Sequence, residues 1–199
     1  IMGVYKFNNA QKRMRPKNIK ITENDELISV GLTSGSDKVL IGTYDGKCIM
    51  FNETDVRPMG RDTQGVKSMT LEKGDRVVDM SIVDDNKAII TMTENGYGKR
   101  SEISDYRLQS RGGKGVKAGA FTAKTGKLVG LKLVGEDENI MIITNNGTII
   151  RVASDDISTI GRNTQGVRIM RIEDGTTVSK IAITPDGGEE GEEEPAEES

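Results

Sequence analysis

Short runs of alternating hydrophobic and polar residues recur along the chain, separated by turns rich in Gly, Asn and Asp. Alternation with a period of two is typical of half-buried β-strands. Helix signals are nearly absent, and the best of them is a single turn at Ser154–Ile157. We therefore predict an all-β protein with strands at Ile1–Phe7, Ile19–Thr22, Leu27–Leu32, Lys38–Thr43, Lys47–Phe51, Lys67–Leu71, Arg76–Val83, Ala88–Thr93, Gly98–Ile103, Gly119–Thr122, Leu128–Val134, Ile140–Thr144, Thr148–Ala153, Arg168–Ile172 and Val178–Thr184.

Neighbouring strands are joined by turns whose residues favour tight hairpins. The first clear hairpin crosses Tyr44-Asp45-Gly46, and Asp-Gly supplies the positive φ that such turns require. Similar turns occur at Asn95-Gly96 and at Asn145-Asn146-Gly147. A further pairing is predicted between Lys67–Leu71 and Arg76–Val83, around the turn Lys73-Gly74-Asp75.

These hairpins belong to an internal repeat of about 50 residues. The octamer at 60–67, Gly-Arg-Asp-Thr-Gln-Gly-Val-Lys, recurs at 161–168 as Gly-Arg-Asn-Thr-Gln-Gly-Val-Arg, and a related loop lies at 111–117. Four strands in each 50 residues is the spacing of propeller-like folds, in which neighbouring blades must stack. We expect an open arc over 1–184, with repeats at about 38–86, 87–138 and 139–184 and a partial repeat at 1–37. The chain begins with Ile1 inside that partial repeat, so we expect a piece of a longer protein.

The charge distribution points to an anionic partner for the folded part. The whole chain has a net charge of −3, but Pro185 to Ser199 holds eight acidic residues and no basic one. Residues 1–184 then carry 28 basic and 23 acidic residues, a net charge of +5. A basic body with an acidic end suggests a nucleic-acid partner. The tail at 185–199 is expected to be disordered, and both solubility and competition with DNA are open roles for it.

The stretch Gln109–Gly115, Gln-Ser-Arg-Gly-Gly-Lys-Gly, has the composition of a loop that holds an anion. Glycine accepts positive φ and allows close approach, and successive backbone N–H groups in such a turn can surround an anion. An isolated loop of this kind is also compatible with a solvated surface turn, but here the basic loops recur in each repeat. We predict sequence-independent binding of double-stranded DNA through Gln109, Arg111, Gly112, Gly113, Lys114, Gly115, Lys117, Arg61, Lys67, Arg162, Arg168, Lys99, Arg100, Arg13 and Arg15.

Several other classes of function are disfavoured by the composition. The chain has no His and a single Cys48, so no His-based triad, zinc site of the usual kind or internal disulfide is expected. No apolar run reaches the roughly 18–20 residues that a membrane helix needs. We predict no catalytic residue, no metal site and no cofactor in this chain, no membrane association and a cytoplasmic location.

At the repeated loops the sequence resembles the C-terminal domain of the DNA gyrase A subunit, in the type IIA topoisomerase family. The stretch Gln109–Gly115 is similar to the gyrase A box of that domain, and the loops at 60–66 and 161–167 resemble its degenerate copies. The box is usually basic at its second position, where this chain has Ser110, and the resemblance places the principal box upstream of this chain.

The resemblance implies a β-pinwheel whose blades exchange strands and whose basic rim wraps DNA in support of ATP-dependent negative supercoiling. It also implies two partners, the gyrase B subunit and a second A subunit, with the cleavage tyrosine, ATP and Mg in other parts of the enzyme. Three alternatives remain: the equivalent domain of the topoisomerase IV A subunit, a propeller-like platform for protein interactions, and an enzyme in its own right.

Overall fold

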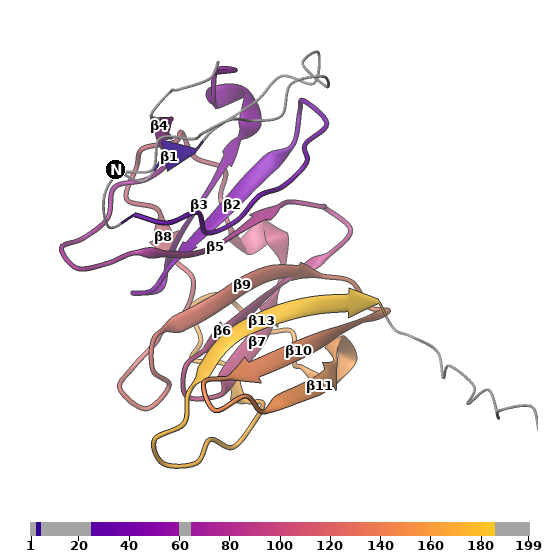
Figure 1. The fold of residues 1–199 in the computed structure, drawn as a ribbon. Coiled ribbons are helices and arrows are strands. Elements are labelled where there is room, and N and C mark those ends of the chain that lie inside the picture. Colours follow the sequence, from indigo (N-terminus) through magenta and orange to yellow (C-terminus); the bar gives the residue numbers. More distant parts are fainter. Residues whose placement is uncertain (1–2, 5–24, 60–64, 186–199) are drawn as a thin grey trace, which may run out of the picture.

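The computed structural model describes residues 3–4, 25–59 and 65–185, and within these ranges the regular elements are β-strands and single-turn 3-10 helices (Figure 1). The all-β prediction is therefore confirmed. None of the helices in these ranges has the length and hydropathy needed to cross a bilayer. The predicted strand Ile19–Thr22, the candidate site residues Arg13, Arg15 and Arg61, and the acidic residues after Pro185 lie outside the described residues.

The strands form three large antiparallel sheets, which we call the first, second and third blades, and one small sheet. The first blade has the order β5-β2-β3-β8, the second β12-β7-β6-β9 and the third β11-β10-β13. The small sheet pairs β1 with β4. The strands are β1 (Gly3–Val4), β2 (Lys38–Thr43), β3 (Lys47–Asn52), β4 (Val66–Lys67), β5 (Val77–Ile82), β6 (Ala88–Thr93), β7 (Tyr97–Ser101), β8 (Val116–Lys117), β9 (Leu128–Val134), β10 (Glu138–Thr144), β11 (Ile149–Ala153), β12 (Val167–Arg168) and β13 (Val178–Pro185).

Each repeat contributes three strands to its own blade and a short fourth strand to the blade before it. Strand β8 follows the second hairpin in sequence but pairs with β3 of the first blade, and β12 pairs in the same way with β7. The 3-10 helices η2 (Glu53–Asp55), η3 (Ile103–Asp105) and η4 (Ser154–Asp156) follow the middle hairpin of each blade. The blades therefore exchange strands, and the predicted turn at Ser154–Ile157 is confirmed as η4.

Four strand predictions are wrong, and one of them is Arg168–Ile172, where only Arg168 lies in a strand, β12. Lys67–Leu71 does not pair with Arg76–Val83, because only Val66–Lys67 is a strand and its partner is β1. Gly119–Thr122 is not a strand, since the pairing residues lie earlier, at Val116–Lys117. The segment Leu27–Leu32 forms no strand either: none of the described residues pairs with it, and Leu32 is 97% exposed.

Apolar side chains fill the space between successive blades. Leu40 and Met50 of the first blade pack with Ile89, Leu128 and Leu131 of the second. A corresponding cluster joins the second blade to the third and contains Ile90, Met92, Ile140, Ile142 and Ile181. Because side chains alternate across a strand, β2, β3 and β6 each contribute to the clusters on both of their faces. The sheets therefore stack as blades do in a propeller, as Figure 1 shows.

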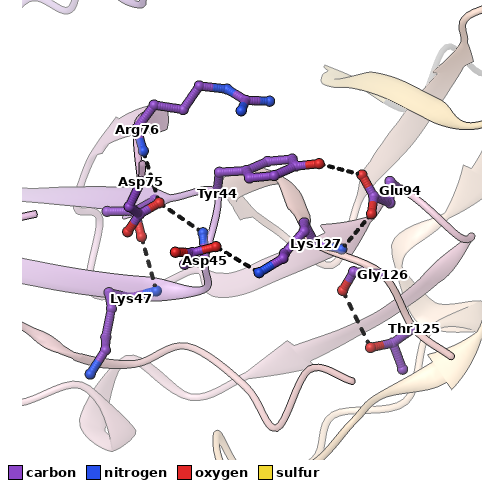
Figure 2. A network of polar contacts seen from close by, with 10 residues as sticks. Tyr44, Asp45, Lys47, Asp75, Arg76, Glu94, Thr125, Gly126 and Lys127 are labelled. Atoms are coloured by element: carbon purple, nitrogen blue, oxygen red, sulfur yellow. Dashed lines mark hydrogen bonds and ion pairs between the residues drawn. The ribbon is translucent and has the colours of Figure 1, made fainter. Parts of the chain in front are cut away.

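Polar contacts join the hairpin-turn ends of the first and second blades (Figure 2). The Tyr44 hydroxyl donates to Glu94 Oε2 at 2.8 Å, and Lys127 Nζ lies 2.7 Å from Asp45 Oδ1. The Arg76 guanidinium lies over the Tyr44 ring, 3.7 Å from its centroid. The hydrogen bond to the Glu94 carboxylate, together with partial burial, raises the pKa of Tyr44. Tyr44 thus has a packing and hydrogen-bonding role in fixing one blade against the next.

An ion pair between Lys87, just before β6, and Glu138, at the start of β10, predicts an acid-sensitive part of the stability. Lys87 Nζ lies 2.5 Å from Glu138 Oε1, and the Gly135 N–H donates to Glu138 Oε2 at 2.7 Å. Partial burial alone opposes ionisation, but these two hydrogen bonds and the charge of Lys87 outweigh it and lower the pKa of the Glu138 carboxyl.

A carboxyl whose folded pKa lies below its unfolded value stabilises the fold above the unfolded pKa of 4.5 and loses that effect as the pH falls through the folded value. We therefore expect the difference in free energy of unfolding between the unmodified chain and Glu138→Gln to be largest near pH 6 and to shrink between pH 5 and pH 3. Urea unfolding at several pH values measures it, and a difference that stays constant with pH would contradict this assignment.

Candidate nucleic-acid interface

The loop Gln109–Gly115, which we call the box loop, lies on the outer edge of the first blade. Leu108 forms a parallel bridge with Met50 of β3, and the Gln109 N–H donates to the Met50 carbonyl at 2.8 Å. The chain then leaves the edge and returns at β8, where Val116 is opposite Cys48. The box loop therefore projects between two points at which its own chain adds to the outer edge of a blade.

The loop Gly161–Gly166, which we call the third-repeat loop, has the same placement one blade later. Thr159 forms a parallel bridge with Arg100, and Val167 is opposite Gly98 of β7. The two loops are also linked along the edge, since the Ala120 N–H just after β8 donates to the Thr164 carbonyl at 3.0 Å. Equivalent loops of consecutive repeats thus lie on one continuous outer rim.

The three glycines of the box loop have different structural roles. Gly115 has φ of 71°, and a Cβ there would lie 2.3 Å from the Cys48 carbonyl oxygen. Its absent side chain therefore allows close approach to β3 rather than to a phosphate. Gly112 has φ of 87° with open space where a Cβ would lie, and the nearest atom to a Cβ at Gly113 is 3.7 Å away. The outer side of the loop at these two residues is open.

Hydrogen bonds fix which way the backbone of the box loop points. The Thr70 hydroxyl donates to the Gly112 carbonyl at 2.7 Å, and the Thr70 N–H donates to the Gly113 carbonyl at 2.8 Å. Because the carbonyl and N–H of one trans peptide point in opposite directions, the N–H groups of Gly113 and Lys114 point away from Thr70. Neither donates to any residue that the structure describes. Two adjacent amides of this kind, beside the Lys114 ammonium, can receive an anion.

Arg111 and Arg162 occupy equivalent positions and make equivalent contacts with the protein backbone. Arg111 donates from Nε to the Asp55 carbonyl at 3.0 Å and from Nη1 to the Lys67 carbonyl at 2.8 Å. Arg162 donates from Nε to the Asp105 carbonyl at 2.9 Å and from Nη1 to the Lys117 carbonyl. Each guanidinium thus joins the end of a 3-10 helix to the end of a donated strand. Their predicted contact with DNA stays a prediction, with Nη2 as the nitrogen that these bonds leave unused.

Two of the predicted site residues make their polar contacts with the protein, and the burial of Lys99 argues against its predicted contact with DNA, while that of Arg100 stays a prediction. Lys99 is only 1% exposed, and its ammonium is surrounded by acceptors of the third-repeat loop. Arg100 donates from Nε to the Ile157 carbonyl at 2.8 Å and pairs with Asp155 at 3.2 Å. The local density of cations in the sequence suggests both residues, but consecutive side chains of β7 point to opposite faces, and on each face carbonyls of the third repeat lie within reach. Lys99 is not placed to meet a phosphate.

The most regular feature of the rim is a cation at the end of each donated strand. Lys67 ends β4, Lys117 ends β8 and Arg168 ends β12, and all three side chains are exposed. Arg168 also donates from Nη2 to the Tyr97 hydroxyl at 2.9 Å. Lys114 is 72% exposed and lies 3.5 Å from the exposed carboxylate of Glu72, and such surface ion pairs contribute little to stability.

Sequence reasoning missed Thr70, which directs the box loop, because its equivalent in the next repeat is Ala120 and no motif marks it. It predicted Gln109 as a DNA-binding residue; this residue is half-buried, and its side-chain nitrogen has no partner among the described residues. Within the described ranges, no three His, Cys, Asp or Glu side chains are grouped so that they could hold a metal ion.

Comparison with known proteins identifies the family. The family model described as DNA gyrase C-terminal domain, beta-propeller, matches residues 37–84, 87–134 and 138–185. The DNA gyrase A subunit of Staphylococcus aureus (strain MRSA252) is 46% identical over 179 residues, and that of Staphylococcus epidermidis (strain ATCC 12228) is 45% identical over 166 residues. These alignments cover 88% and 82% of this chain. The chain belongs to the DNA gyrase C-terminal domain family.

Solved structures agree with the fold. The structure of a DNA gyrase A C-terminal domain aligns with a TM-score of 0.76 at 28% identity, covering 82% of this chain and 56% of that one. The C-terminal domain of a DNA topoisomerase IV aligns with a TM-score of 0.78 at 23% identity, covering 85% and 52%, and supports the fold alone. The chain spans about a fifth of the curated relatives, 20% and 19% of their lengths. The predicted resemblance to the gyrase A subunit is confirmed.

Proposed function

We propose that this chain binds double-stranded DNA along its outer rim, without regard to base sequence, as part of a gyrase A subunit. The observation that carries the proposal is the equivalent placement of Lys67, Lys117 and Arg168 at the ends of three consecutive donated strands. Regularly spaced exposed cations neutralise phosphates and carry no base code. The outward amides of Gly113 and Lys114 in the box loop add hydrogen-bond donors between two of these cations.

The chemistry on the described surface favours this function over catalysis. Tyr44 is hydrogen-bonded to Glu94 between two blades, and Tyr106 is buried. We propose that the chain is a non-catalytic part of an ATP-dependent type IIA topoisomerase in the cytoplasm. Negative supercoiling, the B subunit and a second A subunit belong to the whole enzyme in this proposal, and ATP and Mg are used by its other parts.

The proposal predicts which charges matter for DNA affinity. Lys67→Gln with Lys117→Gln removes two rim cations, and we expect the dissociation constant for a 40-base-pair duplex to rise about tenfold or more at low salt, equally for unrelated sequences. Lys73→Gln with Lys180→Gln removes two exposed cations outside the donated strands and serves as the charge-matched control. Fluorescence anisotropy measures both.

Equal losses in the two double variants would show that net charge, not the rim, determines affinity. No binding by the unmodified chain at low salt would favour the second candidate, a propeller-like platform whose basic rim contacts an acidic protein. Two apolar side chains beside the rim cations support this second candidate: Leu108 is 47% exposed and Val167 is 38% exposed. Protein interfaces combine exposed apolar residues with charged ones.

A further inference from the structure

Lys99 is a buried cation that the other blades lack at the equivalent position. It lies in the middle of β7, where the first blade has Ile49 in β3 and the third has Ile150 in β11. Long charged side chains are almost never fully buried unless their charge is compensated. An ammonium 1% exposed in the middle strand of a blade therefore requires a structural reason.

The reason lies in the third-repeat loop, which folds around the Lys99 ammonium. Lys99 Nζ is 3.2 Å from the Gly161 carbonyl oxygen, 2.9 Å from that of Thr164 and 3.3 Å from the Thr164 hydroxyl, and it also donates to the Arg162 carbonyl. Three carbonyls from four consecutive residues thus converge on one nitrogen, which compensates its burial with acceptors from a single loop.

Because these carbonyls point inward to Lys99, the N–H groups of the same peptide bonds point outward. In a trans peptide the N–H points away from the C=O, so the N–H groups of Arg162, Asn163 and Gln165 point away from Lys99. The Arg162 N–H is taken by Asp105 Oδ2 at 3.1 Å. Those of Asn163 and Gln165 donate to none of the described residues. The loop therefore presents two unused donors on the rim.

The box loop shares one of these orientations, since the Gly113 carbonyl, equivalent to that of Thr164, is also held from within the protein. There the side chain and N–H of Thr70 hold the Gly112 and Gly113 carbonyls from the neighbouring repeat. The position equivalent to Thr70 in the next repeat is Ala120, which has no hydroxyl and donates only its N–H to Thr164. The Ala120 N–H thus replaces that of Thr70, whereas the Thr70 hydroxyl has no counterpart there. Lys99 instead holds the Gly161, Arg162 and Thr164 carbonyls from beneath.

We propose that Lys99 is a positioning residue of the DNA-binding rim: its ammonium holds the third-repeat loop with its N–H groups outward, ready to receive phosphate oxygens. Lys99 does not touch DNA itself. The effect of Lys99 on DNA affinity rests on the proposed DNA-binding function. The ordering of the loop by Lys99 is a property of the free protein and can be measured without DNA.

The first test uses Lys99→Met, which keeps the side-chain volume but removes the ammonium. Hydrogen exchange in the free chain should become at least about tenfold faster at Arg162 and Thr164, whose N–H groups donate to Asp105 Oδ2 and the Gly161 carbonyl, because a loop without its central donor opens locally. Lys132→Met is the matched control, since it removes a partly buried ammonium from β9, where Lys132 pairs with Asp79 at 2.5 Å. It should leave exchange in the third-repeat loop unchanged. Unchanged exchange in folded Lys99→Met overturns the proposal.

The second test connects the loop to DNA through a double-mutant cycle. Lys99→Met and Arg162→Gln should each weaken duplex affinity about three- to tenfold, and the double variant should lose little more than either alone, because both act through one loop. Fully additive losses would overturn the coupling. If the unmodified chain does not bind DNA, the proposed function fails, while hydrogen exchange still decides whether Lys99 orders the loop.

A third measurement needs no substitution and covers the case in which Lys99→Met does not fold. Burial, followed by the neighbouring charge of Arg162, lowers the pKa of Lys99 to about 8, with Asp105 and Cys48 the other ionisable groups facing it. The amide chemical shifts of Arg162–Gln165 should therefore titrate together between pH 7 and 9.5 with a midpoint near 8. Shifts that stay flat over this range would overturn the role of the ammonium.

Discussion

Replacing Gly115 by alanine is expected to lower the free energy of unfolding by about 3 kcal/mol or more, among the largest effects of any single methyl group in this chain. The residue has φ of 71°, where a Cβ is strained, and the added carbon would lie 2.3 Å from the Cys48 carbonyl oxygen and 2.9 Å from its carbon. Both are backbone atoms of β3, so no side-chain rotation relieves the clash. The pairing of β8 with β3 must therefore loosen.

Gly113→Ala in the same loop is the matched control. Its φ is not positive and no atom lies within 3.7 Å of the added carbon, so its stability should stay within about 0.5 kcal/mol of the unmodified chain. Urea unfolding monitored by circular dichroism measures both variants. Equal stability of the two would mean that strand exchange at β8 does not depend on the close approach of Gly115.

Arg111→Lys is expected to destabilise the fold by about 2 kcal/mol although it preserves the charge. The planar guanidinium reaches two carbonyls in different directions, those of Asp55 and Lys67, and an ammonium cannot reproduce that fork. Losing it leaves the end of η2 and the end of β4 without their shared donor. The expected effect is therefore on stability as well as on any contact with DNA.

Arg107→Lys makes the same chemical change at an exposed arginine a few residues earlier and should leave stability unchanged. Thermal and urea unfolding of the two variants give the comparison. If Arg111→Lys is as stable as the unmodified chain, Arg111 is not a structural link, and its contribution to the rim is that of a charge alone.

The hairpins of this fold could be predicted because their signals are local. The turn Tyr44-Asp45-Gly46 has its glycine at φ of 82°, and β2 and β3 lie within a residue of their predicted ends. The strand exchange could not be derived from pattern alone. Strands β8 and β12 are two residues long, too short to show alternation, and β8 pairs with a strand about 70 residues earlier.

The basic loops of the candidate site could be located from the sequence. Which of their cations are exposed and which contact the protein could not. The chain sequence shows how many cations each loop holds, whereas the direction of each side chain depends on the face of a strand or the carbonyls nearby. Lys99 and Lys117 are both lysines in basic stretches of the sequence. Lys99 is buried beneath a loop, whereas Lys117 is exposed on the rim. Thr70 carried no signal because its role arises only from a neighbouring repeat.

The salt dependence of duplex DNA affinity tests the rim most directly. Each phosphate neutralised adds about 0.9 to the magnitude of the log–log slope, so contacts from Lys67, Lys117 and Arg168 predict a slope of about −2.7 or steeper for the unmodified chain. Lys67→Gln with Lys117→Gln should reduce its magnitude by about 1.8, and Lys73→Gln with Lys180→Gln should not. A slope near zero, or one that the rim substitutions leave unchanged, would contradict the account.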